Sequence, residues 1–270
     1  MFTRATGLVI VPFWLTAMAW LVAHDVLPGL TADDPPKLRA TEWLEREGKE
    51  SQYAIFGESG RLGTIWTRYL LEGFAIQRQD LIWIEEFPVD IAPLRMSVNS
   101  SFTPEGLLDE FTLRAHNAYA NMRLHGERFH ADFSFSFQLG SIDRTFTVPL
   151  TDGGMIAGAF HPFSQLTDLH LGQRWRMQVF NPVAALTGLG PRFLPWVVEV
   201  TGQERIHVGD RAMDCLIVEG PNTRAWVDPR GVVQAQELTL PVAGKLRIVR
   251  ESSYDAELRD RVRQLPFLGR

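Results

Sequence analysis

Cysteine is almost absent from this sequence: Cys215 is the only one among 270 residues. A single thiol cannot form an internal disulfide, so no disulfide framework stabilises the fold. No cysteine lies near the N-terminus, and we therefore expect no lipid-modified cysteine there. A chain of this length has enough apolar material to build a core without such crosslinks.

An excess of basic charge is also missing. The formal net charge is −5, whereas a nucleic-acid-binding domain needs a basic face. Basic residues do recur at alternating positions, but they are mixed with acidic ones, which is typical of a solvated sheet face. We predict no nucleic-acid partner.

Motifs for metal and cofactor chemistry are lacking as well. The seven histidines form no HExxH or HxH pattern, and a zinc site needs three or four converging ligands. The spacing of Gly57, Gly60 and Gly63 imitates a nucleotide loop, but it opens a strand and a turn where a phosphate site needs a helix. The sequence predicts no metal site and no cofactor.

Catalytic motifs are missing too. No Gly-x-Ser-x-Gly elbow is present. Cys215 lies in a strand pattern that buries it beside Ile217, whereas a reactive thiol must be accessible. Glu85 and Glu86 are neighbours on a strand and therefore face opposite sides. No residues combine a nucleophile, a base and an orienting group, so we predict a protein that is not an enzyme and has no catalytic residues.

One long apolar run is present, at residues 5–23. It carries no charge over nineteen positions, follows Arg4 and precedes Asp25. This length suits a membrane-spanning helix, and the charge order places the N-terminus inside. The alternative is a cleaved signal peptide with its cleavage site at residues 17–19. Either way the remainder lies outside the cytoplasmic membrane; we predict a single-pass protein of that membrane with a periplasmic domain.

The chain divides into four segments by composition. We predict a signal anchor at residues 1–24, a proline-containing tether with a short helix at 25–52, an antiparallel β domain at 53–252, and a short exposed helix or tail at 253–270. Within the tether the helix is expected at residues 40–49.

Alternation of apolar and polar residues dominates the third segment. From Phe129 to Leu139 every second residue is apolar, which predicts one strand with its phenylalanines on one face. Residues 125–127 are expected to turn into this strand. Similar runs separated by turn residues, such as Gly209-Asp210 and 229–231, predict about eleven antiparallel strands in a meander.

Two segments break the alternation. Residues 155–171 carry apolar residues at helical spacing and predict a helix on the sheet. Residues 181–195 are apolar but rich in glycine and proline, so a loop is expected. The fold class is then mainly β: a bent antiparallel sheet or half-barrel with one or two packed helices, plus the N-terminal membrane helix.

Two short motifs resemble a known family. Residues 53–63, with a G-x-x-(I/L)-G turn, and residues 225–237, with a W-(V/I)-D-x-x-G-x-(V/L) strand pair, are similar to a bacterial envelope domain related to the lipoprotein carriers LolA and LolB. The resemblance implies an incomplete barrel around a lipid-sized apolar pocket. It defines no binding residues. A membrane-tethered chain departs from the soluble carriers of that family.

Aromatic side chains are the remaining candidates for a ligand site, because ligand clefts are largely apolar and often aromatic. We predict a groove for a lipid or acyl chain, with the loop at 181–195 over its mouth. The alternative is a scaffold that docks an envelope protein and whose concave face is simply filled core. The residues predicted to line the groove are Phe129, Phe133, Phe135, Phe137, Trp83, Trp175 and Trp226.

Overall fold

A computed structural model describes most of the chain beyond residue 49. The residues it describes are 36, 50–72, 75–86, 93–104, 108–119, 121–130, 132–149, 155–157, 166, 168–180, 193–240 and 244–265. The predicted anchor at 5–23 and the predicted helix at 40–49 lie outside these residues. Among the helices that are described, none is long and apolar enough to cross a membrane.

The described residues form fifteen strands and one helix. The first eight strands are β1 (Glu50–Gly57), β2 (Gly60–Glu72), β3 (Ala75–Ile84), β4 (Leu94–Phe102), β5 (Leu108–His116), β6 (Asn121–Phe129), β7 (Asp132–Leu139) and β8 (Ile142–Pro149). The others are β9 (Met155–Ala157), β10 (Arg174–Phe180), β11 (Phe193–Val208), β12 (Arg211–Gly220), β13 (Thr223–Val227), β14 (Val233–Leu240) and β15 (Gly244–Arg250), followed by α5 (Ala256–Gln264).

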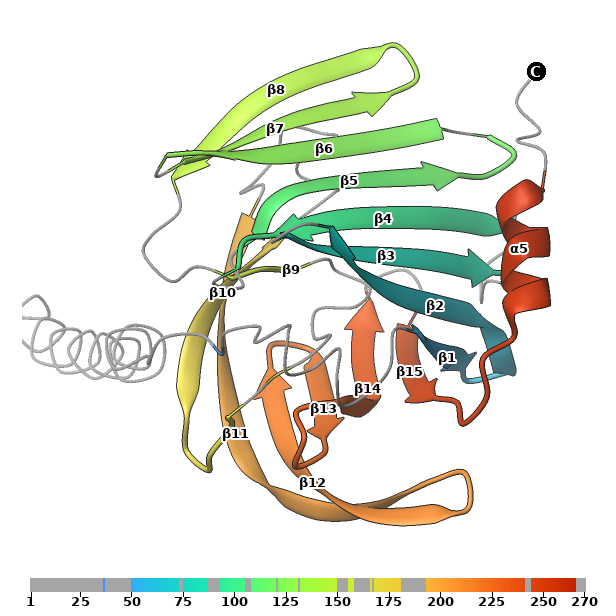
Figure 1. Ribbon diagram of the computed structural model, residues 1–270, viewed down its shortest axis with the longest axis vertical. Helices are drawn as coiled ribbons and strands as arrows, with labels where there is room; N and C mark the ends of the chain where they lie inside the picture. The colour runs from blue at the N-terminus through green and yellow to red at the C-terminus, as the bar shows by residue number, and fades with distance from the viewer. Residues whose placement is uncertain are drawn as a thin grey trace, which may run out of the picture.

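All fifteen strands belong to one open sheet in the order β8-β7-β6-β5-β4-β3-β2-β1-β15-β14-β13-β12-β11-β10-β9. Neighbours pair antiparallel except β9 and β10, which are parallel. Figure 1 shows the sheet curving through the β1–β15 pair from an upper group, β2–β8, into a lower group that curls round. The prediction of a mainly β, bent antiparallel sheet is confirmed.

The two faces of the sheet differ in composition. Successive side chains of a strand point to opposite faces, so the register assigns each residue to one of them. One face, called the inner face below, carries Tyr53, Ile65 and Ile82, which pair in register and are buried. The other, the outer face, carries Trp66 and most of the ion pairs.

Helix α5 packs on the outer face, beside β2–β4 (Figure 1). Its N-cap is Asp255, whose carboxylate accepts a hydrogen bond from the Leu258 amide at 2.8 Å. At its other end the Arg95 guanidinium donates to the carbonyls of Val262 and Leu265, both at 2.8 Å. The sequence predicted this helix correctly, but it is docked and buries Val262, and is not a fully exposed tail.

The predicted single strand from Phe129 to Leu139 is wrong. The chain reverses between Phe129 and Asp132, which pair with each other, and His130 adopts a left-handed backbone with φ 57°. Phe129 therefore ends β6, and β7 begins only at Asp132. The predicted turn at 125–127 lies inside β6.

Two further predictions need correction. Residues 155–157 belong to strand β9, not to a helix, and form a parallel ladder with β10. Residues 193–195 belong to β11, not to a loop, and the rest of the predicted loop lies outside the described residues. The turns at 209–210 and 229–231 are confirmed, and the strand count is fifteen, not about eleven.

Candidate ligand-binding face

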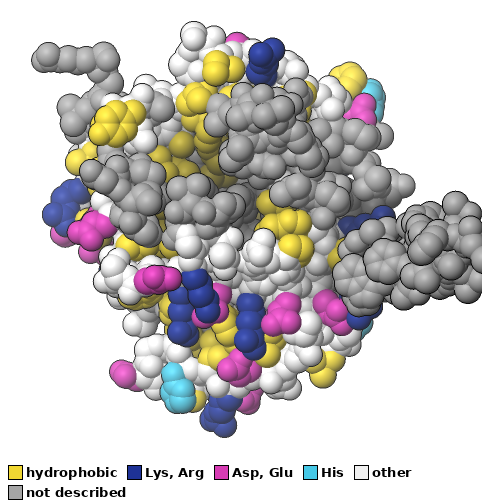
Figure 2. Space-filling view, turned by 180° about the vertical axis from the view of Figure 1, so that it is seen from behind, with side chains coloured by type: hydrophobic (Ala, Val, Ile, Leu, Met, Phe, Trp, Pro, Cys, Tyr) yellow, Lys and Arg dark blue, Asp and Glu magenta, His cyan; other side chains and the backbone are white. Residues whose placement is uncertain are grey.

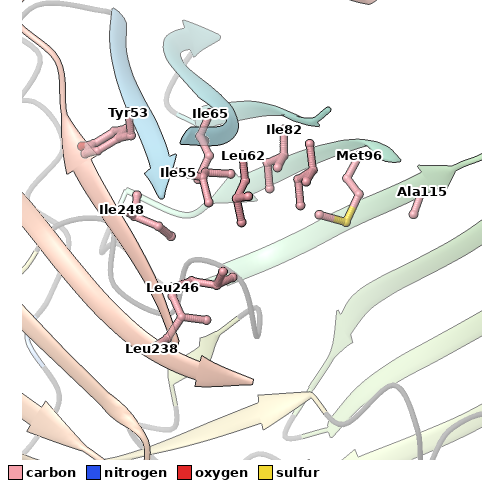
Figure 3. Packing of buried hydrophobic residues seen from close by; sticks show 11 residues of the cluster. Tyr53, Ile55, Leu62, Ile65, Ile82, Met96, Ala115, Leu238, Leu246 and Ile248 are labelled. Atoms are coloured by element: carbon pink, nitrogen blue, oxygen red, sulfur yellow. The ribbon is translucent and has the colours of Figure 1, made fainter. Parts of the chain in front are cut away.

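Buried apolar residues extend along the inner face of the sheet. The register joins them into one surface, because Val218 pairs with Ala225, Ala225 with Gln236, and Gln236 with Ile248. Three clusters divide this surface. Figure 3 shows the middle cluster, in which residues of β14 and β15 and residues of β1–β5 point into the same space.

The cluster nearest β8 is built from phenylalanines. Phe133, Phe135 and Phe137 of β7 are at most 1% exposed. The Phe133 and Phe135 ring centroids lie 5.0 Å apart, and Phe135 stacks on Phe146 of the edge strand at 5.1 Å. Such ring pairs contribute about 0.5–1.5 kcal/mol beyond the area they bury. This end of the face is therefore a continuous aromatic surface.

The cluster on the opposite half is mostly aliphatic. It is formed by Leu166, Trp175, Met177, Val179, Val198, Val200, Val218, Ala225, Val227 and Val233. Trp175 is fully buried, yet its indole Nε1 has no hydrogen-bond partner among the described residues. A buried donor without a partner costs about 1–3 kcal/mol, so this indole is a place where a ligand acceptor would be stabilising.

Polar groups are few on this face, and they are buried. Gln236 is 1% exposed, and within the part of the chain that the structure describes neither its Nε2 nor its Oε1 has a hydrogen-bond partner. Further along the face, Thr67 donates a hydrogen bond of 2.6 Å to Asp80, and the Arg78 guanidinium pairs with the same carboxylate at 2.9 Å. An apolar surface with a few polar groups is the usual composition of a ligand site.

A cavity of about 250 Å³ adjoins the aliphatic cluster. Leu166, Leu169 and Leu216 form its apolar side, and Asp168, Asp214 and Asp228 lie at its polar side. Asp228 is committed to the local turn, because it accepts from the Val232 amide at 3.0 Å and from Gln234 Nε2 at 2.9 Å. The cavity is smaller than the roughly 300–1,000 Å³ of typical ligand pockets, so alone it holds only part of a ligand.

The seven residues predicted to line the groove do not come together at one site. Phe133, Phe135 and Phe137 share the inner face at one end, and Trp175 shares it at the other. Phe129 is 67% exposed and pairs with Asp132. The hairpin therefore places Phe129 on the outer face of the sheet, whereas Phe133 is on the inner face.

Trp83 and Trp226 are also on the outer face. Trp83 lies between the inner residues Ile82 and Ile84, and its indole donates to Glu85 at 3.1 Å. Trp226 packs against Cys215 and donates to Glu204 at 2.8 Å. Neither ring belongs to an inner groove.

Cys215 is buried, as the sequence predicted, on the outer side of β12. Burial, together with the nearby Asp228, Asp214 and Glu204 charges, raises the pKa of this thiol to about 11. A thiol with a raised pKa and 1% exposure is a poor nucleophile. Across the described residues, no group of three or more His, Cys, Asp or Glu side chains is arranged to hold a metal ion.

The outer face carries charges of both signs. Arg224 lies 3.2 Å from Glu204 and 3.4 Å from Glu219, and Lys245 lies 2.8 Å from Glu237. Figure 2 shows dark blue and magenta side chains interspersed on the lower part of the face it presents. The mixed, solvated sheet face expected from the sequence is thus the outer one.

The polar residues of the inner face were missed from the sequence. Ile76, Arg78, Asp80 and Ile82 alternate along β3, so all four share one face. Two charged residues among buried isoleucines in an alternating run are a signal that could have been read. Gln236 in β14 is likewise a polar residue on a buried face, because its partners on the adjacent strands, Ala225 and Ile248, are buried.

Comparisons with known proteins add little. No family model matches the chain, and no curated protein matches it. A crystal structure of a DUF1089 family protein from Pseudomonas aeruginosa is similar, with 16% identity and a TM-score of 0.37, over 63% of this chain and 87% of that chain. This likeness is too distant to carry an argument, and the resemblance to LolA and LolB stays a prediction.

Proposed function

We propose that this protein binds an apolar ligand, a lipid or acyl chain, on the inner face of its sheet, as a non-catalytic binding protein. The observation that carries the proposal is the continuity of that face. Three apolar clusters follow one another in register from β7 through β1 and β15 to β10. An extended apolar molecule matches an extended apolar surface of this kind.

The distribution of helix and polar groups supports the same proposal. Helix α5, the one helix in the described part of the chain, lies on the outer face and leaves the inner face to other contacts. The amide of Gln236 and the indole of Trp175, which have no hydrogen-bond partner among the described residues, lie on the inner face. Polar groups of a bound lipid, such as an ester carbonyl, would satisfy donors of this type.

Membrane attachment is a separate part of the proposal. Residues 5–23 form an uncharged apolar run between Arg4 and Asp25. We propose that this run anchors the chain in the cytoplasmic membrane with the sheet on the periplasmic side. A ligand site beside a membrane has direct access to lipid. Cleavage at 17–19 would instead release the domain, and the mass of the mature N-terminus distinguishes the two.

Lipid analysis of the purified full chain tests the ligand proposal. The chain extracted in mild detergent is analysed by native mass spectrometry beside an unrelated single-span protein purified in the same way. We expect a bound acyl species of defined mass on this chain only. Equal, nonspecific lipid on both proteins would contradict the proposal.

A matched pair of variants locates the ligand. Phe135→Leu thins the aromatic cluster, whereas Phe129→Ser changes an exposed ring on the outer face of the same hairpin. The first should lower lipid retention several-fold, since it removes contacts, and the second should leave it unchanged. Circular dichroism verifies that both variants are folded.

A docking role is the second candidate, and the open sheet favours it. Strand β8 is at the end of the strand order and, of the strands that the structure describes, pairs with β7 alone. An unpaired edge presents backbone donors and acceptors to which a partner strand can add. A stoichiometric envelope protein that co-purifies with the chain, together with no bound lipid, would favour this role over the first.

A further inference from the structure

A buried ion pair lies on the inner face at β2–β3. The Arg78 Nε lies 3.1 Å from Oδ1 and 2.9 Å from Oδ2 of Asp80, and Thr67 donates to the same Oδ1 at 2.6 Å. Arg78 and Asp80 are each 8% exposed. Burying a charged pair is costly and weak evidence for stability on its own, so its presence on an apolar face calls for a further role.

One of the three nitrogens of the Arg78 guanidinium, Nε, makes the contacts with Asp80. In the described part of the chain the terminal nitrogens Nη1 and Nη2 make no hydrogen bond. These two nitrogens hold four of the five N–H donors of the group. The Tyr69 ring lies beneath the guanidinium, with its centroid 6.0 Å from the central carbon, and restricts how the group can turn.

The charge around this group is positive. Asp80 is the one acidic residue on the inner face of β1–β4 and β15, since the other acids of these strands alternate onto the outer face. Arg250, which pairs with Tyr53 beside the cluster, adds a second cation. The inner face of these strands therefore carries two arginines and one carboxylate, a net positive charge.

The guanidinium also stays charged. Burial lowers the pKa of Arg78, but the Asp80 carboxylate and Tyr69 outweigh this and raise the pKa above its usual value. Opposite Arg78 on β4 lies Ser100, a buried residue with a hydroxyl that can donate. A guanidinium that is held in place, stays charged and has N–H donors to spare can bind a carboxylate or a phosphate by two parallel hydrogen bonds.

We propose that Arg78 binds the anionic head group, a carboxylate or a phosphate, of the acyl ligand. The inference rests on the proposed function and adds the chemical class of the ligand: an anionic lipid, whose acyl chain runs from β3 along the inner face. Three aspartates line the cavity beside β11–β12, where Arg230 pairs with Asp228 at 3.2 Å; three carboxylates against this cation disfavour an anion there, so the head group lies at Arg78.

Binding of three single-chain probes to the full protein tests the inference. Oleate carries a carboxylate, oleoyl lysophosphatidic acid carries a phosphate, and monoolein is neutral. We expect both anions to bind about tenfold or more tightly than monoolein, the ratio expected of a charge-assisted hydrogen bond. If oleate binds more tightly than the phosphate probe, the head group of the ligand is a carboxylate. If the phosphate probe binds more tightly, the head group is a phosphate.

Variants assign the preference to Arg78. Arg78→Met should remove it, so that oleate and the phosphate probe bind no more tightly than monoolein. Because this substitution strands Asp80 in the interior, the double variant Arg78→Met/Asp80→Asn removes both charges and keeps an acceptor for Thr67. Arg247→Met is the control, since it deletes the same charge from an exposed outer position on β15.

The outcomes separate the two proposals. If no probe binds, the proposed function itself fails. If monoolein binds as tightly as the anions, or if the folded double variant still prefers anions, the apolar site stands and the role of Arg78 is overturned. Loss of the anion preference in the double variant, with Arg247→Met unchanged, establishes it.

Discussion

Cys215 shows how one buried side chain takes its chemistry from its surroundings. It packs with Ile217, Trp226 and Ala235, and it is the only thiol of the chain. Burial disfavours the thiolate and raises the pKa to about 11 from an ordinary 9.0. The folded state thus holds this proton more tightly than the unfolded state, so folding stability should fall as the pH rises from about 9 through about 11.

Thiol labelling checks this expectation. At about pH 8, where an ordinary exposed thiol is reactive, the native protein should react with a thiol reagent far more slowly than the protein in urea. The native rate should rise only as the pH approaches the raised pKa. Rapid labelling of the native protein at the lower pH would show that Cys215 is accessible.

Gln236 provides a second test at the residue scale. Its buried amide has no partner in the described ranges of the chain, so Gln236→Leu should raise the unfolding free energy of the ligand-free protein by about 1–3 kcal/mol. Gln234→Leu, two residues away, should lower it, because Gln234 donates a hydrogen bond of 2.9 Å to the buried Asp228. Urea denaturation of both variants measures the difference. Destabilisation by Gln236→Leu would mean that its amide is satisfied.

At the scale of elements, the β6–β7 hairpin shows where sequence patterns fail. Apolar residues alternate through the reversal, so Phe129 and Phe133 look as if they share a strand and a face. The turn contains no Gly or Asn to mark it; His130 takes the left-handed conformation instead. Gly126, which looked like the turn, lies in β6 between Phe111 and Phe135 of the adjacent strands. Its role is packing.

A glycine-to-alanine pair tests this reassignment. A Cβ at Gly126 would lie 2.6 Å from ring carbons of both Phe111 and Phe133, so Gly126→Ala should destabilise the protein by about 1–3 kcal/mol through overpacking. At Gly202 in β11 the nearest atom would be 3.6 Å away, and Gly202→Ala should be neutral or slightly stabilising. Thermal unfolding compares them. Equal effects would contradict a packing role for Gly126.

At the scale of the whole molecule, local signals predicted the class of fold but not the pairing that joins the two groups of strands. Alternation and turn residues identify strands such as β10, β12 and β14 because these are local properties. The pairing of β1 with β15 joins the first and last strands along the described chain, Tyr53 with Arg250, and no turn residue encodes it. That pairing makes the inner face continuous, and it decides which predicted site residues can meet. The outward positions of Trp83 and Trp226 follow from register, which the sequence pattern alone leaves open.

The position of a bound acyl chain tests the central claim most directly. Brominated stearate quenches tryptophan fluorescence at short range, and Trp175 lies on the inner face whereas Trp83 lies on the outer face. We predict that the full chain is quenched, that Trp175→Phe removes much of the quenched emission, and that Trp83→Phe leaves it unchanged. Absence of quenching in the parent protein, or quenching lost with Trp83→Phe and retained with Trp175→Phe, would contradict an acyl chain on the inner face.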